Sequence, residues 1–546
     1  MTIDLPLRLA RTGLDEATYV WLATKAGLLT PTLPHKAAKI AVGYLKYGGL
    51  GALPVLAAIR YGDRAAVIDE RGALSFKDLD ARSNALANAW RERGLEPGEG
   101  VAILARNHRG FLEATFAAAK CGARIVLLNT DFAGPQVREV AEREGTDLLV
   151  HDDEYAGLLE GVEPRRGRFR CWADTDGPDT IDALIAGASS KAPPAPGVQS
   201  KVILLTSGTT GTPKGASRPE PRSLAPLGAI LSKVPIKARE ITEIPAPMFH
   251  TLGFAHAVMA IAFGSTVVVR RRFDPVAVLD SLETNGATMM VAVPVMLQRM
   301  LDAPGGFDVQ RDFPNLRIIF VAGSQLGAEL ARRATDGFGP VVYNLYGSTE
   351  VAYATVATPD DLMIEPGCVG RPVKGAIVKI LDESGNELST GVTGRIFVGN
   401  GMQFEGYTGG GGKQSVDGLM ASGDVGHFNA DGLLFIEGRD DDMIVSGGEN
   451  VFPGEVEELL ATMPQVEEAS VVGVPDEEYG HRLAAFVVLR GDTTLTSDEV
   501  RDHVRVNLAR YKVPRDVHFL DELPRNPTGK VLKRELRDIA AGVVGP

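Results

Sequence analysis

The residues best placed to do chemistry lie in one short segment. It reads Thr206-Ser207-Gly208-Thr209-Thr210-Gly211-Thr212-Pro213-Lys214-Gly215. Its three glycines allow backbone N–H groups to turn towards one point, its hydroxyls add hydrogen-bond donors, and Lys214 adds a positive charge. The segment directly follows an apolar, strand-like run at 202–205. This combination predicts a loop that holds a polyphosphate.

A Walker A loop does not fit this segment. In that loop the lysine is followed by Ser or Thr, and a helix begins at once. Here Gly215 follows Lys214, and Pro219 and Pro221 disfavour an immediate helix. A P-loop hydrolase is therefore disfavoured, and a Gly/Thr-rich surface turn is the structural alternative.

Five further motifs follow the loop in order. They are Tyr346-Gly347-Ser348-Thr349-Glu350, Ser422-Gly423-Asp424, Gly438-Arg439 with three aspartates after it, Ser446-Gly447-Gly448-Glu449-Asn450 and Pro527-Thr528-Gly529-Lys530. Together with the loop they resemble the signature of the adenylate-forming superfamily, which includes acyl-CoA synthetases, peptide-synthetase adenylation domains and luciferases. The resemblance covers roughly residues 60 to 540 and is strongest to a bacterial fatty acyl-CoA synthetase.

The resemblance implies how ATP and Mg²⁺ would be held. Glu350 offers a hard carboxylate oxygen and, with Thr206, is the candidate magnesium ligand. Tyr346 offers a flat ring to adenine, while Asp424 and Arg439 can bond the ribose hydroxyls. The ATP-binding set implied in this way is Thr206, Ser207, Gly208, Thr209, Thr210, Gly211, Lys214, Gly323, Ser324, Asn344, Tyr346, Gly347, Ser348, Thr349, Asp424 and Arg439.

The C-terminal motifs imply a second set of roles. Lys530 would reach the substrate carboxylate and the α-phosphate during adenylation. Asp441 would be the hinge at which family members rotate the C-terminal domain between the two half-reactions. The coenzyme A tunnel would pass the start of the motif Ser446–Asn450. Lys512 is a weaker candidate for a contact with a coenzyme A phosphate. These residues are Ser446, Gly447, Gly448 and Lys512.

The acyl pocket is implied around Met248–Phe254 and after the strand that ends at Ala322. The segment Met248–Phe254 has no acidic residue. Because an ammonium group buried without a counter-charge is costly, this favours a plain carboxylate over an amino acid. His250 either gates the site or contacts the carboxylate, as the third catalytic candidate beside Lys530 and Glu350, or is a pocket-wall histidine. The predicted pocket is Phe249, His250, Gly253, Phe254 and Gln325.

The predicted function is therefore ATP-dependent activation of a carboxylic acid, with a medium- or long-chain fatty acid as first choice. Acyl-AMP and pyrophosphate form first, and transfer to coenzyme A then releases AMP. One alternative changes the acceptor to the phosphopantetheine of a carrier protein; no carrier domain follows in this chain, which favours coenzyme A. An alternative of another class is an inactive, membrane-associated protein that binds acyl groups or nucleotides.

The elements that must position these motifs can be read from hydrophobic periodicity. Strand-like Val101–Ala105, helical Phe111–Lys120 and strand-like Arg124–Leu128 begin an alternation that predicts βαβ units and parallel sheets in an α/β fold. We expect a large N-terminal domain with a small β subdomain, followed by a small, mobile α+β domain. The expected bounds are a helical extension at 1–60, the large domain at 61–438 with its β subdomain from about 373, a hinge at 439–442 and a lid domain at 443–546.

Composition limits the partners and the compartment. The net charge of −13 argues against a nucleic-acid binder, and the three cysteines show neither a disulfide framework nor zinc-ligand spacing. We expect a cytoplasmic protein, without a signal peptide or a membrane span. Residues 1–60 nevertheless hold seven Lys/Arg and three Asp/Glu. This favours either peripheral contact with the inner membrane face through residues 15–47, or packing on the body or in a homodimer.

Overall fold

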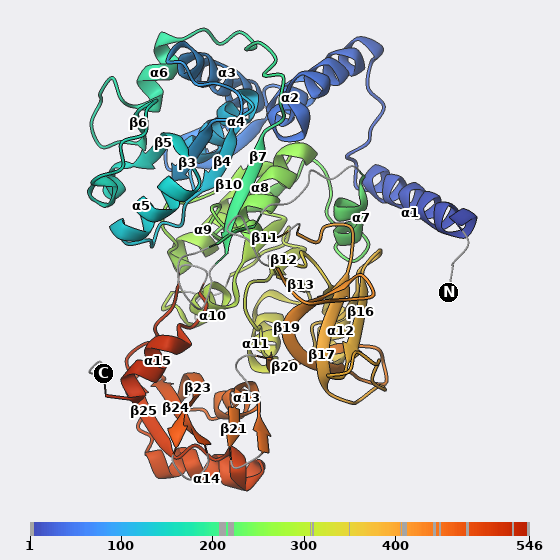
Figure 1. Ribbon diagram of the computed structural model, residues 1–546, viewed down its shortest axis with the longest axis vertical. Helices are drawn as coiled ribbons and strands as arrows, with labels where there is room; N and C mark the ends of the chain where they lie inside the picture. The colour runs from blue at the N-terminus through green and yellow to red at the C-terminus, as the bar shows by residue number, and fades with distance from the viewer. Residues whose placement is uncertain are drawn as a thin grey trace. The chain divides into compact units, whose positions relative to one another are not determined.

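The computed structural model (Figure 1) describes residues 5–206, 214–216, 223–305, 307, 311–348, 350–404, 406, 412–440, 444–446, 449–476, 480–526 and 529–542. Side chains are described for these residues except 5–14, 206, 214–216, 445–446, 449–450 and 480. The chain forms two compact units, residues 1–320 with 401–412 and residues 321–400 with 413–546.

The first unit contains a six-stranded sheet that is parallel except for its last strand. Its core strands are continuous apolar runs, and Val101–Leu104 are fully buried. A parallel sheet covered by helices on both faces requires such runs. The strand order is β6 (Arg168–Trp172), β5 (Thr146–Asp152), β3 (Gly100–Leu104), β4 (Arg124–Leu127), β7 (Lys201–Thr206) and β8 (Lys214–Ala216). Its helices are α3 (Phe76–Glu92), α4 (Arg109–Lys120), α5 (Gly134–Arg143), η1 (Asp153–Leu159) and α6 (Ile181–Gly187).

A second group of paired strands in this unit runs in the order β11 (Met289–Ala292), β9 (Ile241–Glu243), β10 (Thr266–Val268), β1 (Ala65–Asp69) and β2 (Gly72–Ser75). The pairs β11–β9, β9–β10 and β10–β1 are parallel. The accompanying helices are α7 (Ala225–Leu231), α8 (Thr251–Phe263), α9 (Pro275–Asn285) and α10 (Pro294–Asp302), and β12 (Ile318–Val321) ends the stretch. The predicted βαβ alternation and α/β fold class are therefore confirmed.

Local sequence explains where α9 begins and ends. The Asp274 carboxylate accepts a hydrogen bond from the Ala277 N–H at 2.7 Å and so caps the helix N-terminus. Pro275 occupies the first helical position, where its missing N–H costs nothing. Gly286 ends the helix at φ 62°, a left-handed conformation that glycine adopts without strain.

Two helices precede the sheets. They are α1 (Leu5–Lys25) and α2 (Pro34–Tyr61). Both helices lie mainly within the stretch 1–60, which the sequence predicts to be a helical extension. Gly48, at φ 72° and ψ −169°, bends α2 between its two halves, and Gly51, Ala52, Pro54 and Ala57 of the second half are buried.

The second unit is built mainly from antiparallel strands and two groups of helices. Strands β13 (Val342–Tyr346), β14 (Thr355–Ala357) and β15 (Arg371–Pro372) pair in that order beside α11 (Ala328–Phe338) and α12 (Pro359–Ile364). The small sheet follows, with β16 (Ile377–Leu381), β17 (Gly394–Gly399), β19 (Leu419–Phe428), β18 (Ser415–Val416) and β20 (Leu434–Arg439).

The last hundred residues have their own sheet, core and helices. The strand order is β22 (Glu449–Val451), β21 (Ile444–Ser446), β24 (Gly480–Leu489) and β23 (Val466–Asp476), with β25 (Asp516–Leu520) parallel to β24. The helices are α13 (Pro453–Ala461), α14 (Ser497–Asn507), η2 (Arg510–Lys512) and α15 (Lys533–Ala540). This α+β composition is the one predicted for residues 443–546.

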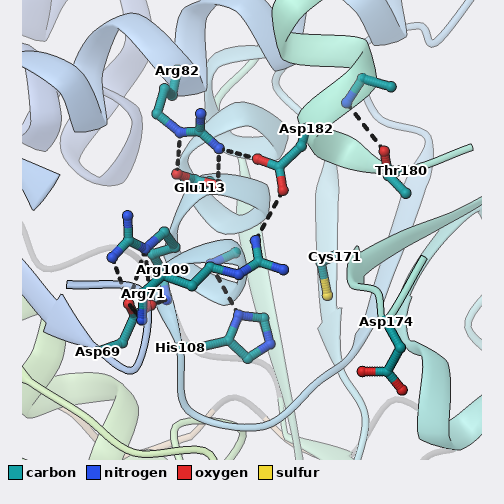
Figure 2. A network of polar contacts seen from close by, with 12 residues as sticks. Asp69, Arg71, Arg82, His108, Arg109, Glu113, Cys171, Asp174, Thr180 and Asp182 are labelled. Carbon is teal, nitrogen blue, oxygen red and sulfur yellow. Dashed lines mark hydrogen bonds and ion pairs between the residues drawn. The ribbon is translucent and has the colours of Figure 1, made fainter. Parts of the chain in front are cut away.

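A network of charged side chains ties three helices of the first unit together (Figure 2). Arg82 of α3 donates from Nε to the Glu113 carboxylate of α4 at 2.5 Å and from Nη2 to Asp182 of α6 at 2.5 Å. Arg71, in the turn between β1 and β2, also binds Asp182 at 2.9 Å. Only 1% of the Glu113 side chain is exposed. A charge buried this deeply is stable only while its partner remains.

We therefore expect Glu113→Ala to lower the free energy of unfolding of the first unit by about 2 kcal/mol. The value is below that of a fully buried pair because Arg82 is partly exposed and keeps Asp182 as a partner. All three tryptophans (Trp21, Trp90 and Trp172) lie in this unit, so urea unfolding can be followed by tryptophan fluorescence.

Glu163→Ala is the matched control, because it removes a carboxylate that is 76% exposed and lies 3.4 Å from Arg168. The control should cost less than about 0.5 kcal/mol. Equal losses for the two variants would contradict the stabilising role of the network.

Candidate functional site

The centre of the candidate site in the second unit is the carboxylate of Asp424. The Tyr346 hydroxyl, at the end of β13, donates to Asp424 Oδ2 at 2.6 Å. Arg439 is the cross-strand partner of Asp424 in the antiparallel pair β19–β20, and its Nε lies 3.6 Å from Asp424 Oδ1. Tyr346 and Arg439 lie 78 and 15 positions from Asp424 in sequence, yet both reach its carboxylate. Arg439 does so because β19 pairs with β20.

The electrostatic balance at Asp424 comes from burial and from several groups that oppose it, including a hydrogen bond with Ser422. Burial raises the pKa of the Asp424 carboxyl above its ordinary value, because desolvation disfavours the charged form. The Tyr346 hydrogen bond and the positive charges of Arg439 and Lys530 act in the opposite direction. Lys530, which the sequence marked only through its motif, therefore acts electrostatically on the same carboxylate.

A second lysine belongs to this cluster, and sequence reasoning did not identify it. A Cβ atom at Gly423, which has φ 88°, would lie 3.3 Å from Lys413 Nζ and 3.2 Å from Arg439 Nη2. Gly423 is thus required both for its backbone conformation and for the space beside the two cations. Lys413 directly follows the four-glycine run 409–412, and that lysine after a glycine run was the only available signal.

The turn after β13 holds the candidate magnesium ligand. Ser348 Oγ donates to a Glu350 carboxylate oxygen at 2.9 Å and accepts from the Glu350 N–H at 3.2 Å. A Cβ atom at Gly347 would lie 2.2 Å from the Ala352 carbonyl oxygen, so only glycine allows this turn. The partly exposed carboxylate of Glu350 is a hard oxygen donor, which fits a magnesium ion that keeps its other ligands from water and phosphate.

In the first unit, His250 is a partly buried and neutral side chain. It occupies the N-cap position of α8, with its ring centroid 4.5 Å from that of Phe249. Burial lowers the pKa of His250 to about 4, and no charged group among the described residues contributes to that shift. Its Nε2 atom is buried and has no hydrogen-bond partner within the described part of the chain. An unpaired buried nitrogen is costly, so it points to a ligand or water.

Asn107 positions the loop that leads to His250, and sequence reasoning missed it. Its Nδ2 donates to the carbonyl oxygens of Ile244 (3.1 Å) and Ala246 (2.8 Å), and its Oδ1 accepts from the Met248 N–H at 2.7 Å. Asn107 follows β3 at the carboxyl end of a parallel strand. That location is where ligand-site residues of α/β folds gather, and it was the usable signal.

His256 is a second buried histidine, further along α8. Its Nδ1 lies 2.8 Å from the Leu252 carbonyl oxygen, and burial lowers its pKa to about 4. Its Nε2 has no partner among the described side chains and borders a cavity of about 10 Å³ that is also lined by Thr242 and Ser265. That volume holds about one water molecule, which would bond the nitrogen.

Several predicted residues have other partners or lie outside the described residues. Gln325 Nε2 donates to Glu458 at 2.8 Å, and Lys512 forms an ion pair with Glu455. Gly323 has φ 103°, and Asn344 is buried within β13. The residues Ser207–Pro213, Thr349, Asp441, Gly447 and Gly448, and the side chains of Thr206, Lys214 and Ser446, lie outside the described part.

One group of potential metal ligands in the described chain is a closed hydrogen-bonded cluster. Asp152 Oδ1 lies 2.8 Å from His108 Nε2 and accepts from Cys171 Sγ at 3.2 Å. His108 Nδ1 accepts from the Gly110 N–H at 3.1 Å, so the proton of a neutral ring is on Nε2 and faces Asp152. This nitrogen is therefore a donor, and the cluster serves to hold β5, β6 and α4 together.

The AMP-binding enzyme family profile matches residues 56–408, and the profile of its C-terminal domain matches residues 455–530. The chain belongs to this family. The predicted membership of the adenylate-forming superfamily is thereby confirmed, as is the prediction of an AMP-forming ligase. The His250 segment and Tyr346 lie within the first match, and Lys530 is the last residue of the second. Lys413, Asp424 and Arg439 lie between the two matches.

Relatives and solved structures of different specificity resemble this chain. It is 33% identical to a feruloyl-CoA synthase from an Amycolatopsis species, over 90% of this chain and 98% of the relative. It is 32% identical to a fatty acid–[acyl-carrier-protein] ligase from Streptomyces coeruleorubidus, over 87% and 93%. The structure of o-succinylbenzoate CoA synthetase from Bacillus subtilis with its acyl-adenylate superposes with a TM-score of 0.77, at 27% identity over 89% and 98%.

The two buried histidines predict how stability depends on pH. The folded pKa values of about 4 lie below the ordinary value of 6.5, so the folded chain stays neutral while the unfolded chain takes up protons. Stability is therefore complete above about pH 6.5 and is lost as pH falls towards about 4. Each histidine should cost about 2 kcal/mol by about pH 5.

Urea unfolding followed by tryptophan fluorescence at several pH values measures this dependence. His256→Gln removes one titrating group, so its stability should fall less steeply than that of the wild type between about pH 6.5 and 5. Parallel profiles for the two proteins would show that His256 takes up a proton in the folded state.

Proposed function

We propose that this protein activates a carboxylic acid without an amino group, with a medium- or long-chain fatty acid as first choice, and transfers the acyl group to coenzyme A. The observation that carries the proposal is the Asp424 cluster, in which a carboxylate, a tyrosine hydroxyl and an arginine meet and on which the charge of Lys530 acts. Such a cluster can accept from ribose hydroxyls and place a cation beside the α-phosphate.

The first half-reaction joins the acid to AMP. A carboxylate oxygen attacks the α-phosphorus of ATP, the bond to the β-phosphate oxygen breaks, and pyrophosphate leaves. Lys530 would neutralise charge that develops on the carboxylate and the α-phosphate. Glu350, with Thr206, would hold a magnesium ion, which supplies neutralisation of the phosphate charge when bound. The loop at 206–215 would hold the pyrophosphate portion.

The second half-reaction transfers the acyl group. The thiol sulfur of coenzyme A attacks the carbonyl carbon of the acyl-adenylate, the carbon–oxygen bond to phosphate breaks, and AMP leaves while the thiol proton passes to solvent. We assign Ser446, Gly447 and Gly448 to the tunnel for the thiol. Lys512 would have to leave Glu455 in order to contact a coenzyme A phosphate, so it is the weakest of these assignments.

His250 supports an acid without an ammonium group. Its surroundings add no charge to the effect of burial, and Met248–Phe254 contains no acidic residue. An ammonium ion in this setting would lose its hydration without gaining a counter-charge. An aryl acid fits the same neutral surroundings as a fatty acid, and feruloyl-CoA synthase is among the relatives. Aryl acids are therefore the runner-up substrates.

A carrier protein is the alternative acceptor, because one relative at 32% identity is a fatty acid–[acyl-carrier-protein] ligase. Purified enzyme with acyl-adenylate, coenzyme A and a phosphopantetheinylated carrier in competition would separate the two. Cytoplasmic location, peripheral membrane contact through residues 15–47 and homodimer formation remain proposals as well.

A panel of acids tests the substrate assignment. The panel contains fatty acids of increasing length, ferulate, indoleacetate and an amino acid, and AMP release is measured with and without coenzyme A. We expect AMP release from fatty acids to exceed that from the aryl acids and to require coenzyme A for turnover, with none from the amino acid. A stronger response to ferulate would replace the first choice by the runner-up.

Lys530→Ala tests whether the chain is an active ligase or only binds acyl groups and nucleotides. Pyrophosphate exchange, which reports the first half-reaction alone, should fall about 100-fold or more, because one preorganised charge is lost where negative charge develops. Lys533→Ala is the matched control, three residues later and 3.6 Å from Glu457, and should retain exchange. No exchange by the wild type with any acid would support the inactive binding protein.

A further inference from the structure

The N-terminal helices differ in charge from the rest of the chain. From Ala17 to Gly62 there is no Asp or Glu, while the same stretch contains four lysines and Arg60. The whole chain has 70 acidic residues and a net charge of −13. A stretch of this length without acids therefore forms a local cationic region on an anionic protein, and such a region attracts anionic partners.

The first half of α2 is helical and largely exposed. The bend at Gly48 separates it from the second half, in which Gly51, Ala52, Pro54 and Ala57 are buried. Between Pro34 and Tyr47 only Gly43 and Tyr47 are buried, and both lie on one side of the helix. Figure 1 shows α2 at the periphery of its unit. This half of the helix thus presents most of its surface to solvent.

The outward side of this half-helix is apolar and bordered by cations. Ala38, Ala41, Val42 and Leu45 lie opposite Gly43 and Tyr47 at helical spacing, and Val42 and Leu45 are 62% and 84% exposed. Lys39 and Lys46 lie along the same edge of this stripe. Lys39 is exposed, and Lys46 is partly exposed. An apolar stripe with lysines along its edge is the pattern of a helix that lies in a membrane interface.

Helix α1 presents a similar stripe. Tyr19 and Ala23 are buried, and Tyr19 packs so closely on α7 that a Cβ atom at Gly228 would lie 2.1 Å from its ring. The opposite side carries Val20 and Trp21, which are 44% and 57% exposed, with Lys25 placed 5.2 Å from the Trp21 ring centroid. Tryptophan is a residue that favours the level of the lipid headgroups.

A spanning arrangement fits α2 less well than an interfacial one. Pro34–Tyr61 is long and apolar enough to cross a membrane by length and composition. The helix is bent at Gly48, contains Pro54, and buries Gly51, Ala52, Pro54 and Ala57 against the protein. Crossing a bilayer would require the second half to leave that packing, whereas lying in the interface leaves it intact.

We propose that Val20 and Trp21 of α1 and the Ala38–Leu45 stripe of α2, with Lys25, Lys39 and Lys46, form a docking surface for a bilayer that contains anionic phospholipid. The apolar side chains enter the headgroup region, and the lysines bind lipid phosphates. The family profile begins at residue 56, so this surface lies outside the part of the chain that matches the family. The inference does not depend on the proposed substrate.

Flotation of the full-length protein with vesicles tests the surface. Wild type should float with vesicles of phosphatidylcholine and phosphatidylglycerol, less with phosphatidylcholine alone, and less as salt is raised. Val42→Glu with Leu45→Glu should lower the bound fraction about tenfold or more, because buried apolar area is lost and repulsion is gained. Lys39→Glu with Lys46→Glu should lower binding about tenfold on the anionic vesicles only.

Matched controls separate this surface from exposed residues in general. Ile364→Glu with Val506→Glu changes side chains that are 61% and 82% exposed, and Lys77→Glu with Lys191→Glu reverses exposed lysines elsewhere. Both controls should float like the wild type. Pyrophosphate exchange should be unchanged in the α2 variants, so loss of flotation and loss of adenylation are independent results.

Three outcomes would overturn the proposal. The first is a wild type that floats with neither vesicle. The second is equal loss of flotation in the matched controls. The third is a dimer, seen by light scattering, that Val42→Glu with Leu45→Glu dissociates while the wild type binds no vesicle; that result would assign the surface to a second copy of this chain.

Discussion

The cost of removing charge from water governs this molecule. Asp424 is buried enough for its pKa to rise, and it stays a useful acceptor because Tyr346, Arg439 and Lys530 oppose that rise. The pairing of β19 with β20 brings Arg439 to Asp424, and the Tyr346 hydroxyl, at the end of β13, donates to the same carboxylate. Much of the second unit can thus be understood as a frame that holds compensating charges at fixed distances.

The first unit solves the same problem by excluding charge. His250 and His256 are kept neutral by burial, and each has a nitrogen without a hydrogen-bond partner among the residues that the structure describes. The neutral surroundings of these two histidines favour apolar groups or a single water molecule and disfavour a buried ion. Elsewhere in the unit, charged side chains are present but have partners. Arg82, Glu113 and Asp182 connect α3, α4 and α6, and the Asp152 carboxylate is shared by His108 and Cys171.

At the N-terminus, apolar side chains are exposed to water instead of being buried. Val42 and Leu45 are exposed to water, which is unfavourable for apolar side chains. The charged residues near them in the sequence are all positive. Large apolar side chains grouped in this way on a described surface mark interaction sites more often than chance exposure does. A surface that holds the protein at a membrane would suit the proposed activation of amphiphilic acids. Membrane binding and acid activation can be tested separately.

The family, the α/β class, the order of the motifs and the residue types of the candidate nucleotide site could all be predicted from the sequence. Those follow from local patterns: glycine and hydroxyl content, strand–helix alternation, and short motifs such as Ser422-Gly423-Asp424. Folding is needed to show that Lys413 lies beside Gly423, that Asn107 holds the loop before His250, and that Lys512 is paired with Glu455. Each of these depends on chain segments distant in sequence that strand pairing and packing bring together, and no local pattern records which distant side chain will be the partner.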